Sequence, residues 1–412
     1  MGVCSVIKRI NVEQLKIGMY ITDLNNQWIP DNNLKKSGIV KYDRTIDQIR
    51  LLDVDELYID TEKGEDCEDG IPLDILQAQQ KKELDEITRE RSLDVDELMD
   101  VSEEFAHASK VHEQAKELVT DILDDIKEGN AIDVKQVEEV SDELIHSVQA
   151  NKNALLTLSR IREKDEYLFE HSVNVGVLMA VLARGNNITG TRLKELVTGA
   201  LLHDVGKILV PIDILNKPGK LTPVEWEEMK RHVQYGERVL GDTPGLSEIS
   251  KAICSQHHER CDGSGYPRKL HDDQISVFGR MAAVVDVYDA VTSDRCYHAG
   301  MDPHNALKKL IEWSAFHLDK DTVYDFIRSI SVYPIGTVVE LDDHSAAIVV
   351  EANHGKQNLP KLKVFFDINK HEALDPYVLD LENDNRQGRR ILATLDPKAI
   401  GFTTAELLRP AV

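Results

Sequence analysis

The sequence has few cysteines, no long hydrophobic run and far fewer basic than acidic residues. Its five cysteines form no C-x-x-C pair, which argues against a disulfide framework and against a thiolate zinc site. The best apolar run, residues 176–183, is far shorter than the roughly 20 residues of a membrane helix. The N-terminus has no apolar segment of the signal-peptide kind. We therefore expect a soluble, cytoplasmic protein with no membrane partner.

The charge balance excludes a second class of function. Asp and Glu number 73 against 49 Lys and Arg, which gives a formal net charge of −24. Such a surface repels the phosphates of nucleic acids and of anionic membranes, so a nucleic acid polymer is not an expected partner. A chain of 412 residues with 42% hydrophobic and 30% charged residues is of globular composition, and its length predicts two to four domains.

The patterning predicts a multidomain, mainly α fold. Residues 1–72 have the short alternating stretches of a small N-terminal accessory α/β unit. Residues 73–130 have apolar positions three and four apart, which predict a helical linker. This helix is expected to be exposed or, as an alternative, to form a coiled coil in a homodimer. Residues 131–332 read as an all-helical bundle, and period-two patterns in 333–412 predict a small β-rich extension.

The sharpest chemical feature of the helical part is the sequence LLHDVGKI. It places His203 beside Asp204, with Lys207 one helical turn later, on what the apolar neighbours predict to be a largely buried helix. A buried carboxylate costs several kcal/mol unless a partner satisfies it. A divalent metal satisfies both groups, and imidazole with carboxylate suits Fe, Mn, Zn or Ni. Taken alone, the pair also fits a surface position or a hydrogen-bonded core position.

Several further histidines and a carboxylate stand at the apolar edges of separate predicted helices. They are His171, His232, His257, His258 and Asp286. One such group is ordinary in a protein core. Together with His203 and Asp204, the set predicts a binuclear metal centre.

A glycine-containing loop follows the paired histidines in HHERCDGSGYP, residues 257–267. Gly263 and Gly265 permit close backbone approach to a ligand, and Tyr266 offers an aromatic face. The spacing matches neither a P-loop nor a dinucleotide fingerprint. An ordinary turn is the alternative interpretation.

These motifs together resemble the HD-GYP family, the HD-domain metal phosphohydrolases that cleave the bacterial messenger cyclic di-GMP. The resemblance covers about residues 140–330 and includes DILNKPGKLTPVEW and ISVFGRMAAVVDVYDAVTS. The region up to about residue 130 resembles, more weakly, the accessory domain that precedes some HD-GYP proteins. GMYI and Trp28 carry that second likeness.

The resemblance implies a set of metal ligands in which Asp204 bridges two ions. The set is His171, His203, Asp204, His232, His257, His258 and Asp286. Members with a third metal have a Glu where this chain has Tyr167, so two divalent ions are expected. Fe or Mn is the favoured metal, and Zn or Ni also fits.

The resemblance also implies how substrate is bound. Lys207 is expected to contact a phosphate oxygen, and Gly265, Tyr266 and Pro267 to receive the nucleotide. Arg295 is expected near the phosphates. His298 stands where relatives usually have Lys or Arg, which is expected to weaken phosphate or guanine binding without changing the metal centre.

The implied activity is hydrolysis of cyclic di-GMP to pGpG, GMP or both by a metal-bridging hydroxide. Two alternatives stay open: a non-catalytic receptor or adaptor that acts through the Gly-Tyr-Pro loop, and a phosphodiesterase for another cyclic dinucleotide. The same loop is a candidate contact for a diguanylate cyclase or other signalling proteins. A catalytic thiol at Cys254 or Cys261 is disfavoured, because the neighbouring histidines are assigned to metal.

Overall fold

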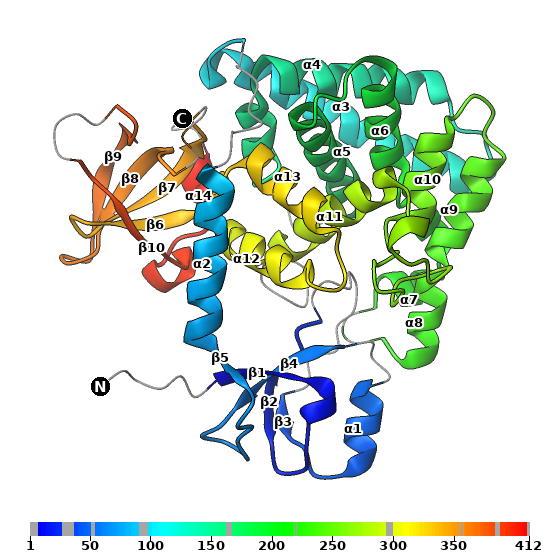
Figure 1. The fold of residues 1–412 in the computed structure, drawn as a ribbon. Coiled ribbons are helices and arrows are strands. Elements are labelled where there is room, and N and C mark those ends of the chain that lie inside the picture. Colours follow the sequence, from blue (N-terminus) through cyan, green and yellow to red (C-terminus); the bar gives the residue numbers. More distant parts are fainter. Residues whose placement is uncertain are drawn as a thin grey trace.

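A helical bundle lies between two small antiparallel sheets (Figure 1). The computed structural model describes residues 7–26, 37–50, 54–89, 98–161, 167–217, 219, 221–293, 300–353, 356, 358–383 and 388–409, without the side chains of 88, 89, 167 and 168. The predicted mainly α, multidomain class is confirmed. Within these described residues, no helix combines the length and hydrophobicity needed to cross a membrane.

The N-terminal unit is a sheet with one covering helix. Its elements are β1 (Ile7–Asn11), β2 (Tyr20–Asp23), β3 (Gly38–Ile39), α1 (Asp43–Arg50), β4 (Glu56–Asp60) and β5 (Ile71–Pro72), in the strand order β3-β2-β4-β1-β5. Alternation in β4 points Leu57 and Ile59 into the core of this unit. Tyr58, between them, points the other way and is also buried, because that face of the strand meets the helical bundle.

The predicted helical linker is two helices, α2 (Leu73–Arg89) and α3 (Val101–Glu128). The expectation of an exposed or self-associating helix is wrong for α3. Its apolar stripe, which includes Val111, Leu118 and Ile122, is buried in the main core, and α3 packs along α4 (Val134–Leu158). The three- and four-residue spacing is therefore explained by packing within the chain.

The bundle continues through nine further helices of the described residues. They are α5 (Tyr167–Gly185), α6 (Gly190–Leu202), α7 (Ile212–Leu215), α8 (Pro223–Lys230), α9 (His232–Gly241), α10 (Glu248–Gln256), α11 (Val277–Thr292), α12 (Pro303–Trp313) and α13 (Lys320–Ile330). Helices α5 and α11 are apolar on nearly all sides and lie at the centre.

Three breaks between consecutive helices shape the site. His203 and Asp204 do not lie within a helix, because α6 ends at Leu202 and the 3₁₀ helix η2 (Val205–Leu209) follows them. A Cβ on Gly206 would lie 1.9 Å from the His232 carbonyl oxygen, so the turn touches the break between α8 and α9. The third break separates α12 from α13.

The C-terminal unit is a sheet that closes one side of the bundle. Its elements are β6 (Val338–Leu341), β7 (Ser345–Glu351), β8 (Lys361–Asp367), β9 (Glu372–Asp380), β10 (Ile391–Thr394) and α14 (Thr404–Leu408), in the strand order β10-β6-β7-β8-β9. Ala346 and Ile348 join the main core, whereas Ala347 and Val349 on the other face join a separate one. The remaining 3₁₀ helices are η1 (Val12–Gln14), η3 (Asp272–Gln274) and η4 (Pro397–Ile400).

The N-terminal sheet docks on α12 through a buried polar network. The Glu312 carboxylate is 1% exposed and accepts hydrogen bonds from Asn25 Nδ2 at 2.8 Å and Tyr58 Oη at 2.7 Å. Lys309 Nζ lies 3.1 Å from the same carboxylate, and Trp313 Nε1 donates to Asn25 Oδ1 at 3.2 Å. The domain boundaries expected near residues 72, 130 and 332 stay predictions, but this contact joins the first unit to the bundle.

We predict that Glu312→Ala lowers the free energy of unfolding by about 3 kcal/mol, because it leaves Lys309 and Tyr58 without their buried carboxylate. Chemical denaturation measures the effect. Glu248→Ala is the matched control, since the Glu248 side chain is 89% exposed and pairs only at the surface with Lys251. An equal free energy of unfolding for the two variants would show that the Glu312 network does not stabilise the fold.

Candidate metal centre

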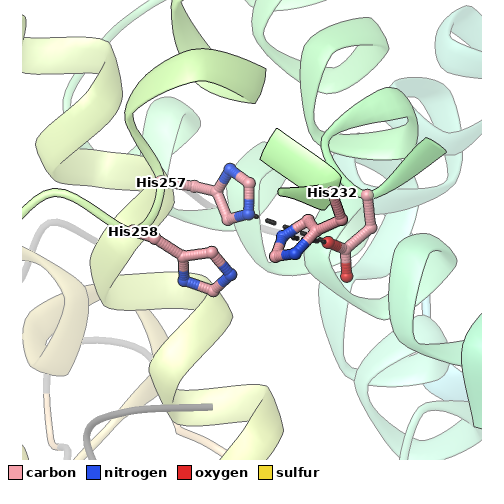
Figure 2. A group of neighbouring side chains, drawn as sticks. His232, His257 and His258 are labelled. Atoms are coloured by element: carbon pink, nitrogen blue, oxygen red, sulfur yellow. Dashed lines mark ion pairs between the residues drawn. The ribbon is translucent and has the colours of Figure 1, made fainter. Parts of the chain in front are cut away.

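The structure brings the seven predicted ligand residues into one buried cluster. Each is between 0 and 2% exposed. They form two groups of possible ligand atoms: Asp204, His232, His257 and His258 in one, and His171, His203 and Asp286 in the other. Figure 2 shows the rings of the first group turned toward one another.

Helix ends supply most of these side chains. His203 caps the end of α6, and Asp204 begins η2 directly after it. His232 opens α9, and His257 closes α10 with His258 next in the chain. These helix ends meet at the centre of the cluster, where all seven side chains are buried. The breaks in the bundle are therefore what bring the ligands together.

Asp204 lies between the two groups. Its Oδ1 is 3.4 Å from His232 Nε2 and 3.7 Å from His257 Nε2, the contacts dashed in Figure 2. Its Oδ2 is 3.3 Å from His203 Nε2 and 3.5 Å from His171 Nε2. Each carboxylate oxygen thus faces a different set of imidazoles, which is the arrangement a bridging ligand requires.

The hydrogen bonds of three imidazoles engage Nδ1 and turn Nε2 toward the cluster. Nδ1 of His203 lies 2.7 Å from the Ala200 carbonyl oxygen, and Nδ1 of His257 lies 2.8 Å from that of Cys254. His232 is held in the same way by the Met229 carbonyl. A carbonyl only accepts, so each Nδ1 donates, which is the orientation that presents Nε2 to a metal.

Several buried polar atoms at the centre have no hydrogen-bond partner among the described residues. They are Nε2 of His203, His232 and His257, both ring nitrogens of His258, Oδ1 of Asp204 and Oδ2 of Asp286. Burial lowers the pKa of His232 to about 4 and the pKa of His258 well below its usual value, so both rings are neutral. Neutral imidazoles and carboxylates are the ligands that divalent metals need, and the residues fit such ions.

His171 is held between two carboxylates. Its Nε2 is 3.1 Å from Asp286 Oδ1, and its Nδ1 is 2.7 Å from Asp289 Oδ2. Burial would lower the pKa of His171, but the hydrogen bonds to Asp286 and Asp289 raise it to about 9. A metal at Nε2 would displace the proton there and leave the Asp289 hydrogen bond in place.

Asp289 is a residue that the sequence analysis missed. It stands one turn after Asp286 in the apolar helix α11 and is 2% exposed. A second carboxylate in a run of buried apolar residues, on the same helix face as a proposed ligand, is the signal that identifies it.

Lys207 is buried beside the bridging carboxylate. It is 3% exposed, and its Nζ lies 2.7 Å from Asp204 Oδ2. Burial would raise the pKa of Asp204, but Lys207 and His203 hold it well below its usual value. The carboxylate is therefore ionised.

The Gly-Tyr-Pro loop packs directly on the cluster. The Tyr266 ring lies 4.6 Å from the His258 ring and 6.1 Å from the Trp226 ring, measured between centroids, and Lys230 Nζ is 5.9 Å from its centre. A Cβ on Gly265 would lie 2.4 Å from the Arg260 nitrogen, so only glycine fits there. Trp226 ends the stretch DILNKPGKLTPVEW but was not predicted as a site residue, and Lys230 carries no signal in the sequence that relates it to the site.

Some of the residues named in the sequence analysis fall outside the described residues. Arg295 and His298 lie outside the described residues, as does the side chain of Tyr167.

Burial raises the pKa of the Cys254 thiol, and it raises that of Cys261 to about 11. Both thiols are protonated at neutral pH, which argues against a nucleophilic cysteine.

Two parts of the chain match known domain families. Residues 156–322 match the HD domain family, and residues 7–137 match a domain of unknown function, DUF3391. The chain is 35% identical to cyclic di-GMP phosphodiesterase PA4108 of Pseudomonas aeruginosa over 403 residues, which are 97% of this chain and 93% of that protein.

Two other similarities are more limited. The chain is 40% identical to 3'3'-cGAMP-specific phosphodiesterase 2 of Vibrio cholerae over 123 residues, 30% of this chain and 24% of that protein. Among solved structures, Bd1817, an HD-GYP-type protein from Bdellovibrio bacteriovorus, matches with a TM-score of 0.47 and 16% identity, over 78% of this chain and 98% of that one. Because the likeness to the Pseudomonas relative extends over nearly the full length of both proteins, the chain belongs to the HD-GYP family of HD-domain proteins, with DUF3391 at its N-terminus.

Proposed function

We propose that this protein is a metal-dependent phosphodiesterase that hydrolyses cyclic di-GMP to pGpG, GMP or both. The observation that carries the proposal is the buried carboxylate of Asp204, whose two oxygens face two separate groups of buried imidazoles. The full-length relative from Pseudomonas, named a cyclic di-GMP phosphodiesterase, supports the choice of substrate.

Two divalent ions would be held by the two ligand groups, with Asp204 shared between them. Imidazole and carboxylate ligands favour Fe or Mn and also accept Zn or Ni. When bound, such a pair lowers the pKa of a water molecule and neutralises charge on a phosphoryl oxygen. The surrounding histidines keep their Nδ1 protons on backbone carbonyls, so they are ready to bind without rearrangement.

Lys207 would contribute a fixed positive charge to the reaction. Its ammonium group is already ordered beside Asp204, so a phosphoryl oxygen that enters the cluster meets it at little further cost in side-chain entropy. Charge that develops on phosphorus-bound oxygens is stabilised by such preorganised cations. Arg295 and His298 are proposed to contact the second phosphate or a guanine.

The aromatic groups beside the cluster fit a nucleobase. Tyr266 and Trp226 lie near each other at the site, and both are partly exposed. Lys230 adds a positive charge over the Tyr266 ring. Bases stack on such faces, and the adjoining Gly265 and Pro267 leave the loop backbone close to the site. The loop would therefore bind and orient the nucleotide.

A receptor without catalysis is the weaker candidate. Nucleotide binding alone does not require seven buried ligand residues, and all seven are present. A different cyclic dinucleotide is a more substantial alternative, because the Vibrio relative, 40% identical over part of the chain, is named for cleavage of 3'3'-cGAMP. Product separation after incubation with each dinucleotide distinguishes these possibilities.

We predict that Asp204→Ala abolishes metal binding and hydrolysis together, because it removes the one carboxylate that both ligand groups face. Metal content per chain and chromatography of cyclic di-GMP products are the two measurements. Asp242→Ala, at an exposed helix end, is the control and should retain both. Full turnover by Asp204→Ala would refute the bridging role.

We predict that Asp289→Asn weakens metal binding about 10- to 100-fold, the usual cost of changing a carboxylate that orients a ligating histidine. Competition with a chelator measures the affinity directly. Asp273→Asn removes an exposed carboxylate and should leave the affinity unchanged. If the two variants bind metal equally well, Asp289 has no part in positioning His171.

We predict that Tyr266→Ala raises KM for cyclic di-GMP about tenfold, because base stacking on an aromatic ring is lost. Tyr266→Phe keeps the ring and should remain close to the wild type. The metal content should be unchanged in both. An equal loss in the two variants would assign the role of Tyr266 to its hydroxyl, contrary to the stacking proposal.

A further inference from the structure

A second carboxylate–histidine cluster lies outside the metal centre. It consists of Asp55, Asp262 and His317, with His317 5% exposed. His317 Nδ1 is 2.8 Å from Asp262 Oδ2, and its Nε2 is 3.8 Å from Asp55 Oδ2. Each ring nitrogen thus faces one carboxylate, Asp262 at hydrogen-bond distance and Asp55 somewhat further away.

The three residues come from three different parts of the molecule. Asp55 directly precedes β4 of the N-terminal unit, and His317 lies in the break between α12 and α13. Asp262 belongs to the Gly-Tyr-Pro loop. In Figure 1 the N-terminal unit lies below α12. His317 therefore links the accessory domain to the loop.

Asp262 also forms hydrogen bonds with Ser264 of the loop. Its Oδ1 accepts the Ser264 N–H at 3.0 Å and the Ser264 hydroxyl at 2.6 Å, two residues before Tyr266. The His317 carbonyl oxygen accepts the Cys261 N–H at 2.9 Å. Burial would raise the pKa of Asp262, but hydrogen bonds from His317 and Ser264 lower it to about 2. The carboxylate is ionised, so Nδ1 of His317 donates the proton.

The far end of the loop is tied down independently. The Glu259 carboxylate is 1% exposed and accepts the backbone N–H groups of Arg268 at 2.7 Å and Leu270 at 2.9 Å. One end of the loop thus depends on a carboxylate of its own segment. The other end depends on His317 and, through it, on Asp55 of the N-terminal unit.

The N-terminal unit is itself held firmly against α12. Its hydrogen bonds to Glu312 lie five residues before His317 in the chain. A displacement of the accessory domain would therefore move the Asp55 carboxylate. It would also move the end of α12, which the segment containing His317 directly follows. Packed side chains and hydrogen bonds can carry coupling between sites, and here each contact is direct.

We propose that His317 is a positioning residue through which the N-terminal domain holds the Gly-Tyr-Pro loop in its binding conformation. This rests on the proposed function, in which the loop receives the nucleotide. Because neither His317 nor Asp262 is in the metal cluster, the effect falls on nucleotide affinity and leaves the metal ions in place. The DUF3391 domain thereby acquires a role in setting substrate affinity.

Two substitutions at His317 separate its contacts. His317→Asn keeps a donor near the Nδ1 position, toward Asp262, whereas His317→Gln keeps one near Nε2, toward Asp55. We expect His317→Gln to raise KM for cyclic di-GMP about tenfold, the cost of a hydrogen bond to a charged group, with kcat and metal content within about twofold of wild type. Amide hydrogen exchange of residues 259–270, measured without nucleotide, should accelerate to a similar extent.

The Asp55 contact is tested by a double-mutant comparison. Asp55→Asn and His317→Asn should each raise KM by about two- to threefold, and combining them should add nothing further, because both remove the same interaction. Asp47→Asn, on an exposed face of α1, and His107→Gln, on α3, are matched controls expected to behave as wild type.

The measurements distinguish failure of the inference from failure of the proposed function. If His317→Gln lowers thermal stability while KM and loop exchange stay at wild-type values, His317 is only structural and the inference is overturned. If the metal-loaded wild type neither binds nor cleaves cyclic di-GMP, the proposed function falls. The exchange of the loop amides then still decides whether His317 holds the loop.

Discussion

The carboxylate of Asp204 is the constraint around which the bundle is built. A negative charge that is 2% exposed must be compensated within the protein, and a single lysine supplies only part of what the surrounding polar atoms demand. Several helices end or begin at the site, and the residues at these ends supply the imidazoles that surround Asp204. The close contact of Gly206 with the start of α9 holds two of these breaks together, so packing and metal chemistry are set by the same turn.

The overall charge of −24 does not conflict with an anionic substrate. Net charge governs long-range attraction to extended polyanions, whereas the proposed site is a small, buried cluster with its own cations. Lys207 lies inside it and Lys230 at its edge. In such an interior a fixed positive charge acts strongly over a few ångströms, because little water screens it.

The sequence predicts chemistry better than it predicts the ends of helices. Period and composition identify the bundle, both sheets and all seven clustered residues, since a buried His or Asp stands out among apolar neighbours. The pattern does not show that His203 and Asp204 lie at a helix break, because LLHDVGKI has the same apolar spacing in a helix and in a turn. Nor does it show that the stripe of α3 is covered by α4, because an apolar stripe looks alike whether its partner is the same chain or another.

Contacts between distant segments were beyond prediction for a different reason. In the sequence Glu312, His317 and Asp55 look like ordinary polar residues. Their structural roles depend on which parts of the folded chain contact one another. The break between α12 and α13 gives one short segment contact with both the accessory domain and the substrate loop. A continuous helix there would carry His317 on one fixed face, and its carbonyl would bond within the helix instead of to Cys261. The break between α12 and α13 therefore lets one short segment contact both the accessory domain and the loop.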